Sequence, residues 1–69
     1  MKQAELKELQ RRLLAASVNL KYAMQQFFIE LAKSGSVTPN TSNHYNECRK
    51  AMNSVIADID VFMLNNVKV

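Results

Sequence analysis

The apolar residues of this chain recur three and four positions apart over two long stretches. In the first stretch the repeating positions are Leu6, Leu9, Leu13, Ala16, Leu20, Ala23 and Phe27. In the second stretch they are Tyr45, Cys48, Met52, Val55, Ile59 and Phe62. Alternation of this kind is the a/d pattern by which one helix packs along another. The pattern therefore predicts two amphipathic helices, each with one apolar seam.

A polar segment, KSGSVTPNTSNHY, interrupts this pattern between residues 33 and 45. It contains the only Gly and the only Pro of the chain, together with several Ser, Thr and Asn residues. Gly35 can adopt the left-handed conformation that commonly ends a helix. The next helix can be capped by Thr38 with Pro39 at its first position, or it can start slightly later behind Thr41 or Ser42. Both starts are compatible with the sequence.

These features predict an all-α fold, an antiparallel two-helix hairpin with a coiled-coil-like seam. We expect a single domain over residues 1–69, with helices at about 3–34 and 43–66 and a turn at about 35–42. A chain of this size buries only about 60% of the surface that its unfolded form exposes. Small domains usually need a disulfide, a metal or a partner. The single Cys48 cannot form an internal disulfide, so we expect a homo-oligomer or a heteromeric partner.

Both helices carry apolar residues outside their seams, and these are Leu14, Val18, Met24, Phe28, Ile29, Leu31, Ile56, Val61, Met63 and Leu64. Two helices packed on each other bury one stripe per helix, so the additional residues stay in water in a lone hairpin. Exposing half a dozen of them forfeits on the order of 10 kcal/mol, which is comparable with the stability of a whole domain. A second copy or another protein is expected to cover this surface.

The charge and the first residues of the chain bear on its location. The net charge is +3, with the excess in the first half, which favours solubility and is a weak signal for nucleic-acid binding. The start, MKQAELKELQRR, lacks the apolar region of a signal peptide. No apolar run approaches the roughly 20 residues of a membrane span, and a lone cysteine fits a reducing compartment. These points predict a bacterial cytoplasmic protein without a membrane partner.

Residues that could carry chemistry are few. His44 and Cys48 share a helix face at a spacing that could supply two metal ligands, but the neighbouring sequence offers no third or fourth. Cys48 as a nucleophile would need an activating base and a dry pocket, which a hairpin does not provide. Asp58 and Asp60 point to different faces and are expected to be solvated. We therefore predict no catalytic residues, no cofactor and no metal site, and hence no enzyme.

Three segments, AKSGSV, NHYNE and AMNSVIADIDVFM, give the chain a resemblance to a known family. Over roughly residues 6 to 64 it resembles the small co-chaperones of type III secretion needle subunits, the YscE/PscE/SsaE-like proteins. Gly35 in the turn and Tyr45 early in the second helix match by position. The resemblance implies a hairpin that binds a TPR-like chaperone subunit in the bacterial cytoplasm. Together the two would keep the needle protein soluble before export.

On that interpretation the second apolar face docks onto the chaperone. From helical position we assign the docking face to Leu14, Val18, Phe28, Ile56 and Met63. The hairpin is expected to form a homo-oligomer when alone.

Two other functions are compatible with the same pattern. A small phage-type inhibitor could use this surface to block a regulator by helix-face binding. A weak nucleic-acid-binding hairpin is less favoured, because Glu5 and Glu8 dilute the basic charge around Arg11 and Arg12. Helix-turn-helix modules also need a third, supporting helix, which the pattern does not predict.

Overall fold

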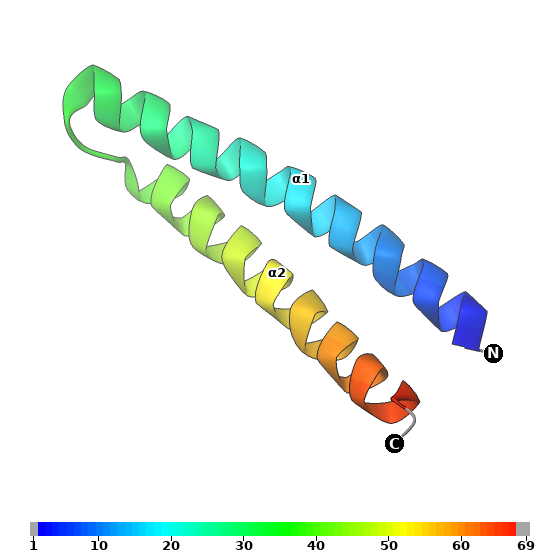
Figure 1. The fold of residues 1–69 in the computed structure, drawn as a ribbon. Coiled ribbons are helices and arrows are strands. Elements are labelled where there is room, and N and C mark those ends of the chain that lie inside the picture. The colour runs from blue at the N-terminus through cyan, green and yellow to red at the C-terminus, as the bar shows by residue number, and fades with distance from the viewer. Residues whose placement is uncertain (1, 68–69) are drawn as a thin grey trace.

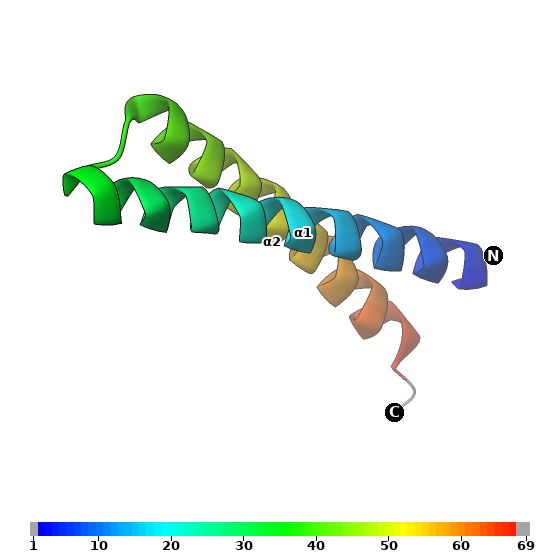
Figure 2. The same ribbon diagram turned by 90° about the horizontal axis from the view of Figure 1, so that it is seen from above.

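The computed structural model describes residues 2–67 as two antiparallel helices joined by a short turn. Helix α1 spans Lys2–Ser34 and helix α2 spans Pro39–Asn66. The helices lie side by side along their length (Figure 1). Seen from above, their axes cross, so that the ends of the hairpin diverge (Figure 2). The fold is the all-α hairpin that the two apolar seams predict.

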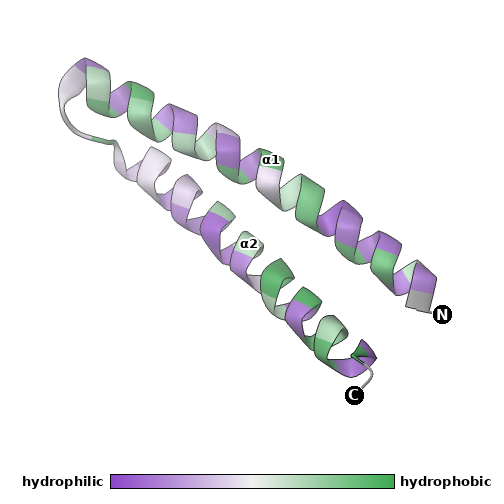
Figure 3. Ribbon diagram, viewed as in Figure 1, coloured by the Kyte–Doolittle hydropathy of each residue, from purple (hydrophilic) through white to green (hydrophobic). Residues whose placement is uncertain are grey.

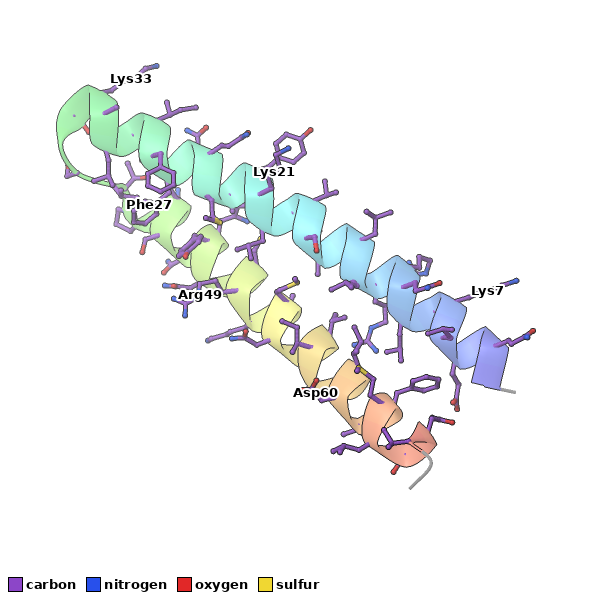
Figure 4. The ribbon with its side chains drawn as sticks, viewed as in Figure 1. Lys7, Lys21, Phe27, Lys33, Arg49 and Asp60 are labelled. Atoms are coloured by element: carbon purple, nitrogen blue, oxygen red, sulfur yellow. The ribbon has the colours of Figure 1, made fainter. Side chains whose placement is uncertain are left out.

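The predicted seams lie between the helices. Their buried members include Ala16, Ala23, Cys48 and Val55, and Phe27 lies between the helices near the turn (Figure 4). Tyr45, the first seam position of α2, packs near the end of α1, and its ring centroid lies 5.4 Å from that of Phe27.

One seam assignment is wrong, that of Leu6, whose side chain is 42% exposed. Leu6 lies near the start of α1, and at this open end of the hairpin the helix axes diverge (Figure 2). A straight α-helix also drifts by about 20° per heptad relative to a strict seven-residue repeat, which turns the first seam position toward the side of the hairpin.

The hairpin is elongated and exposes more surface than a compact protein of its mass. Its radius of gyration is 15.8 Å and its extents are 52 × 19 × 16 Å. A compact chain of this length has a radius of gyration of about 11 Å. The accessible surface is 5605 Å², whereas a folded monomer of this mass exposes roughly 4,400 Å². One hairpin therefore leaves on the order of 1,200 Å² that a compact fold would cover.

The turn sets the start of α2 earlier than expected. Thr38 is the N-cap residue, its side chain accepts a hydrogen bond from the backbone N–H of Thr41 at 3.4 Å, and Pro39 occupies the first helical turn. Proline costs nothing at this position because the N–H that it lacks would have had no partner within the helix. The helix consequently begins four residues before the start expected near residue 43.

Gly35 ends α1 as predicted. It has a positive φ of 75°, and its N–H donates to the carbonyl oxygen of Leu31 at 2.9 Å.

The carboxylate of Glu30 in α1 accepts hydrogen bonds from residues at the beginning of α2. Glu30 accepts hydrogen bonds from the backbone N–H of Thr38 at 3.0 Å, from the hydroxyl of Thr41, and from the side-chain amide of Gln26 at 3.4 Å. The Thr41 hydroxyl, followed by the Thr38 amide, lowers the pKa of Glu30 to about 2. These bonds favour the charged carboxylate, as expected for an acceptor at a helix N-terminus.

Candidate interaction surface

Many large apolar side chains of the hairpin are exposed. They include Leu6, Leu14, Val18, Tyr22, Met24, Phe28, Ile29, Leu31, Ile56, Val61, Met63, Leu64 and Val67. All ten residues that the sequence places outside the seams are in this set. Apolar positions occur along the whole of α1, whereas on α2 they concentrate in the second half (Figure 3).

One side of the hairpin forms a continuous apolar surface, which we call the apolar flank. Its hollows are lined by Leu6, Leu13, Met24 and Phe28 of α1 with Tyr45, Met52 and Met63 of α2. We include the exposed Ile56 because it lies seven residues before Met63 and therefore on the same face of α2. Near the turn, a shallow hollow is lined by Met24, Phe27, Phe28 and Tyr45. A second is lined by Ser17, Leu20, Lys21, Met24, Gln25, Phe28 and Met52. A third, near the open end, is lined by Leu6, Leu9, Gln10, Leu13, Ile59, Phe62 and Met63. Together these hollows extend over most of the length of the hairpin.

The opposite side, which we call the polar flank, is charged. Its hollow is lined by Ala4, Glu5, Glu8, Leu9, Arg12, Asp58, Val61, Phe62 and Asn65. Arg12 forms an ion pair across the helices with Asp58 at 2.8 Å. Glu8 pairs with Arg11 rather than Arg12, with a 3.0 Å bond from the Arg11 Nε, and this bond is the main cause of the lowered pKa of Glu8.

Asp58 is exposed, as expected for a solvated charge, and it also pairs with Arg12 because α2 brings the two residues level, which the sequence did not predict. The two flanks therefore differ in polarity, and the interhelical ion pair lies on the polar one.

A second apolar surface lies on α1 alone. Leu14, Val18, Tyr22 and Ile29 are all exposed, and their spacing of four, four and seven residues keeps them on one stripe. At about 100° of rotation per residue, this outer stripe faces away from the seam and from α2. Lys7 and Lys33 project from the side of α1 that lies away from α2 (Figure 4), whereas Lys21 lines a hollow of the apolar flank together with Met52. The outer stripe is thus an apolar strip with basic neighbours.

The five residues assigned to partner binding are all exposed, but they lie on two surfaces. Phe28 and Met63 line hollows of the apolar flank, and Ile56 lies two helical turns before Met63 on the same side. Leu14 and Val18 belong to the outer stripe. The helical positions of these five residues predicted that they are exposed. The prediction did not separate the residues of the apolar flank from those of the outer stripe. Tyr22 was missed, although its position between Val18 and Ile29 at helical spacing was a signal for it.

His44 and Cys48, the two residues considered as metal ligands, contact each other beside the seam. Cys48 is buried and its Sγ lies 3.9 Å from the Nε2 of the exposed His44. The prediction that Cys48 is a seam residue is confirmed. Among residues 2–67, no group of three or more His, Cys, Asp or Glu side chains is placed to share a metal ion.

Comparison with known proteins finds no family model, no curated protein and no solved structure that matches this chain. The resemblance to the needle-subunit co-chaperones therefore depends on the sequence segments quoted above. Neither helix, over residues 2–67, combines the length and the apolar character needed to cross a bilayer.

Proposed function

We propose that this hairpin is a non-enzymatic binding module whose apolar surfaces are completed by the helices of a protein partner. The observation that carries the proposal is the accessible surface of 5605 Å², compared with roughly 4,400 Å² for a compact monomer of this mass. The difference exceeds the roughly 800 Å² that each partner buries in a standard protein interface. Apolar positions at intervals of three, four and seven residues are typical of helices that dock into grooves.

The co-chaperone interpretation makes this proposal specific. A TPR-like subunit presents grooves between its helices, and such a groove suits the stripe formed by Leu14, Val18 and their neighbours. Phe28, Ile56 and Met63 would contribute from the apolar flank. The hairpin and the chaperone subunit would together keep a type III secretion needle protein soluble in the bacterial cytoplasm before export. The basic side chains beside the outer stripe favour a partner groove with an acidic rim.

Co-expression with candidate TPR-like chaperones and needle subunits, followed by size-exclusion chromatography, tests this function. We expect the hairpin to co-elute with its partner, and the double variant Leu14→Asp/Val18→Asp to elute separately while keeping its helical circular dichroism. The matched control is Asn19→Asp/Ser54→Asp, which adds the same charge at exposed polar positions and is expected to bind normally. A hairpin that ignores every such candidate, or that loses binding equally in both double variants, contradicts the proposal.

A further inference from the structure

We infer that the apolar flank is closed by a second copy of this chain. The two hairpins pack face to face and antiparallel, with a two-fold axis near Ser17, and form a four-helix bundle. This inference goes beyond the proposed function and narrows it. The second copy would take up Phe28, Ile56 and Met63, and the outer stripe with Leu14 and Val18 would stay accessible for a different protein. The roughly 1,200 Å² that one hairpin leaves uncovered includes both apolar surfaces, and a second copy that buries roughly 800 Å² per subunit would cover most of it.

The first observation is the order of side chains that α2 presents on or beside this flank. Residues at equal distances from the middle of α2 form matching pairs, which are Tyr45 with Met63, Arg49 with Asp60, and Met52 with Ile56. The midpoints of these pairs fall at residue 54 or within half a residue of it. An antiparallel copy of α2 would therefore place apolar side chains opposite apolar ones, and Arg49 opposite Asp60. A two-fold symmetric interface requires this kind of self-complementarity.

Helix α1 has a weaker form of this symmetry about Ser17. Leu6 matches Phe28 and Leu13 matches Leu20, which places apolar side chains opposite each other, whereas the polar Gln10 matches Met24. The midpoints fall at residue 17 or within half a residue of it. Ser17 is small, so two copies of α1 can approach closely where the axis passes.

Both midpoints lie at one level of the hairpin. The hydroxyl of Ser17 lies 3.8 Å from the sulfur of Met52, and the Arg12–Asp58 ion pair of 2.8 Å fixes the same register further along. In this register, residue 17 of α1 lies level with residues 52–54 of α2. A single two-fold axis can therefore relate both helices to their copies.

The charges select the antiparallel arrangement. Arg49 and Asp60 are exposed and project from α2 (Figure 4), and the Arg49 guanidinium lies 5.7 Å from the centre of the Tyr45 ring. In the antiparallel dimer each Arg49 lies near Asp60 of the second copy, and this pair occurs twice. If the two-fold axis ran parallel to the long axis of the hairpin instead, α2 would face α1 of the second copy, and Arg49 would lie level with Lys21 of that copy. Like charges at that position would oppose the alternative.

Cross-linking tests the position of the axis. In a Cys48→Ala background whose helicity is checked by circular dichroism, Ser17→Cys is expected to form a covalent dimer with a short bismaleimide. The matched control is Ser54→Cys, which is exposed at the same level but turned toward the polar flank, and it is expected to remain monomeric on denaturing gels. Sedimentation of the unmodified chain is expected to give about twice the 7.9 kDa of one chain.

Exchanging the charges of Arg49 and Asp60 tests whether the two copies are antiparallel. Arg49→Glu and Asp60→Lys should each weaken the dimer roughly tenfold or more, and the double variant should recover most of the affinity. A monomer up to about 100 μM, efficient cross-linking through residue 54 instead of 17, or no recovery in the double variant would overturn the inference. A monomer that still binds a chaperone candidate would assign the apolar flank to the heteromeric partner, and the proposed function would stand without the dimer.

Discussion

Glu30 is the residue that connects the end of α1 with the beginning of α2. We expect Glu30→Gln to lower the thermal midpoint at pH 7, because a neutral amide accepts more weakly from the Thr38 amide and the Thr41 hydroxyl. The folded pKa of about 2 lies below the ordinary value of 4.5. The stabilisation is therefore fully present above pH 4.5 and is lost as the pH falls toward 2. Circular dichroism melts between pH 7 and 2 measure this dependence.

Comparing the native chain with Glu30→Gln isolates the contribution of the Glu30 carboxylate to the thermal midpoint. The difference in midpoint between the native chain and Glu30→Gln should narrow as the pH falls below 4.5. Glu47→Gln, at an exposed position on α2, is the control for a general change in net charge. Two melting curves that stay equally separated from pH 7 to pH 2 would show that the Glu30 charge does not stabilise the turn.

Gly35 is needed for its backbone conformation alone. Its φ is 75°, and a Cβ at this position would meet no atom within 4 Å. We therefore expect Gly35→Ala to destabilise the fold by about 1 kcal/mol through backbone strain, or roughly 4–8 °C in midpoint for a domain of this size. Gly35→Asn should cost less, since Asn tolerates the left-handed region better. Equal losses for Ala and Asn would contradict this explanation.

At the scale of the elements, the seam holds the hairpin together. Ile59 is half-buried between the helices, so Ile59→Asp would place an unpaired charge in the seam. We expect a loss of roughly 3 kcal/mol or more, a large part of the stability of a small domain. Phe62→Asp should act in the same way. Far-ultraviolet circular dichroism at 25 °C should show that both variants lose most of their helical signal.

Ile56→Asp, on the apolar flank, is the matched comparison for Ile59→Asp in the seam. Ile56 is 41% exposed and lies three residues before Ile59. Ile56→Asp should keep the helical signal, because its charge remains in water, and should abolish association with a second copy or a partner. Chromatography and circular dichroism of both variants separate these effects. An equal loss of helicity in Ile56→Asp and Ile59→Asp would mean that seam and flank are wrongly assigned.

The elements and their seam could be predicted from the sequence because helical periodicity is local information. The start of α2 was ambiguous, since Thr38 and Thr41 are both good caps, and the structure selects Thr38. The contacts of Glu30 with the turn and of Arg12 with Asp58 could not be predicted. They depend on how residues of one helix align with those of the other, which the turn determines. Exposure could be predicted for Val18 and Ile56, and their rotation about the helix relative to the seam already implies that they face different directions.

At the scale of the whole molecule, two apolar surfaces point in different directions. The apolar flank spans both helices and contains the self-complementary pattern about Ser17. The outer stripe belongs to α1 alone and has basic neighbours (Figure 4). Closing the flank with a second copy would leave two outer stripes on one bundle, one from each chain. The dimer and the binding of another protein are therefore compatible, and a dimer would offer that protein two equivalent sites.

If the folded hairpin is completed by a second copy, its stability depends on protein concentration, because dilution favours the separated, unfolded chains. With an unfolding enthalpy of roughly 0.7 kcal/mol per residue, two chains of 69 residues should gain roughly 5 °C in midpoint for each tenfold rise in concentration. Melts between about 1 and 100 μM measure this slope. The monomeric variant Ile56→Asp should show a midpoint independent of concentration, and it should melt at a lower temperature than the native chain. A native midpoint that does not move over this range would show that one hairpin is stable with its apolar flank in water.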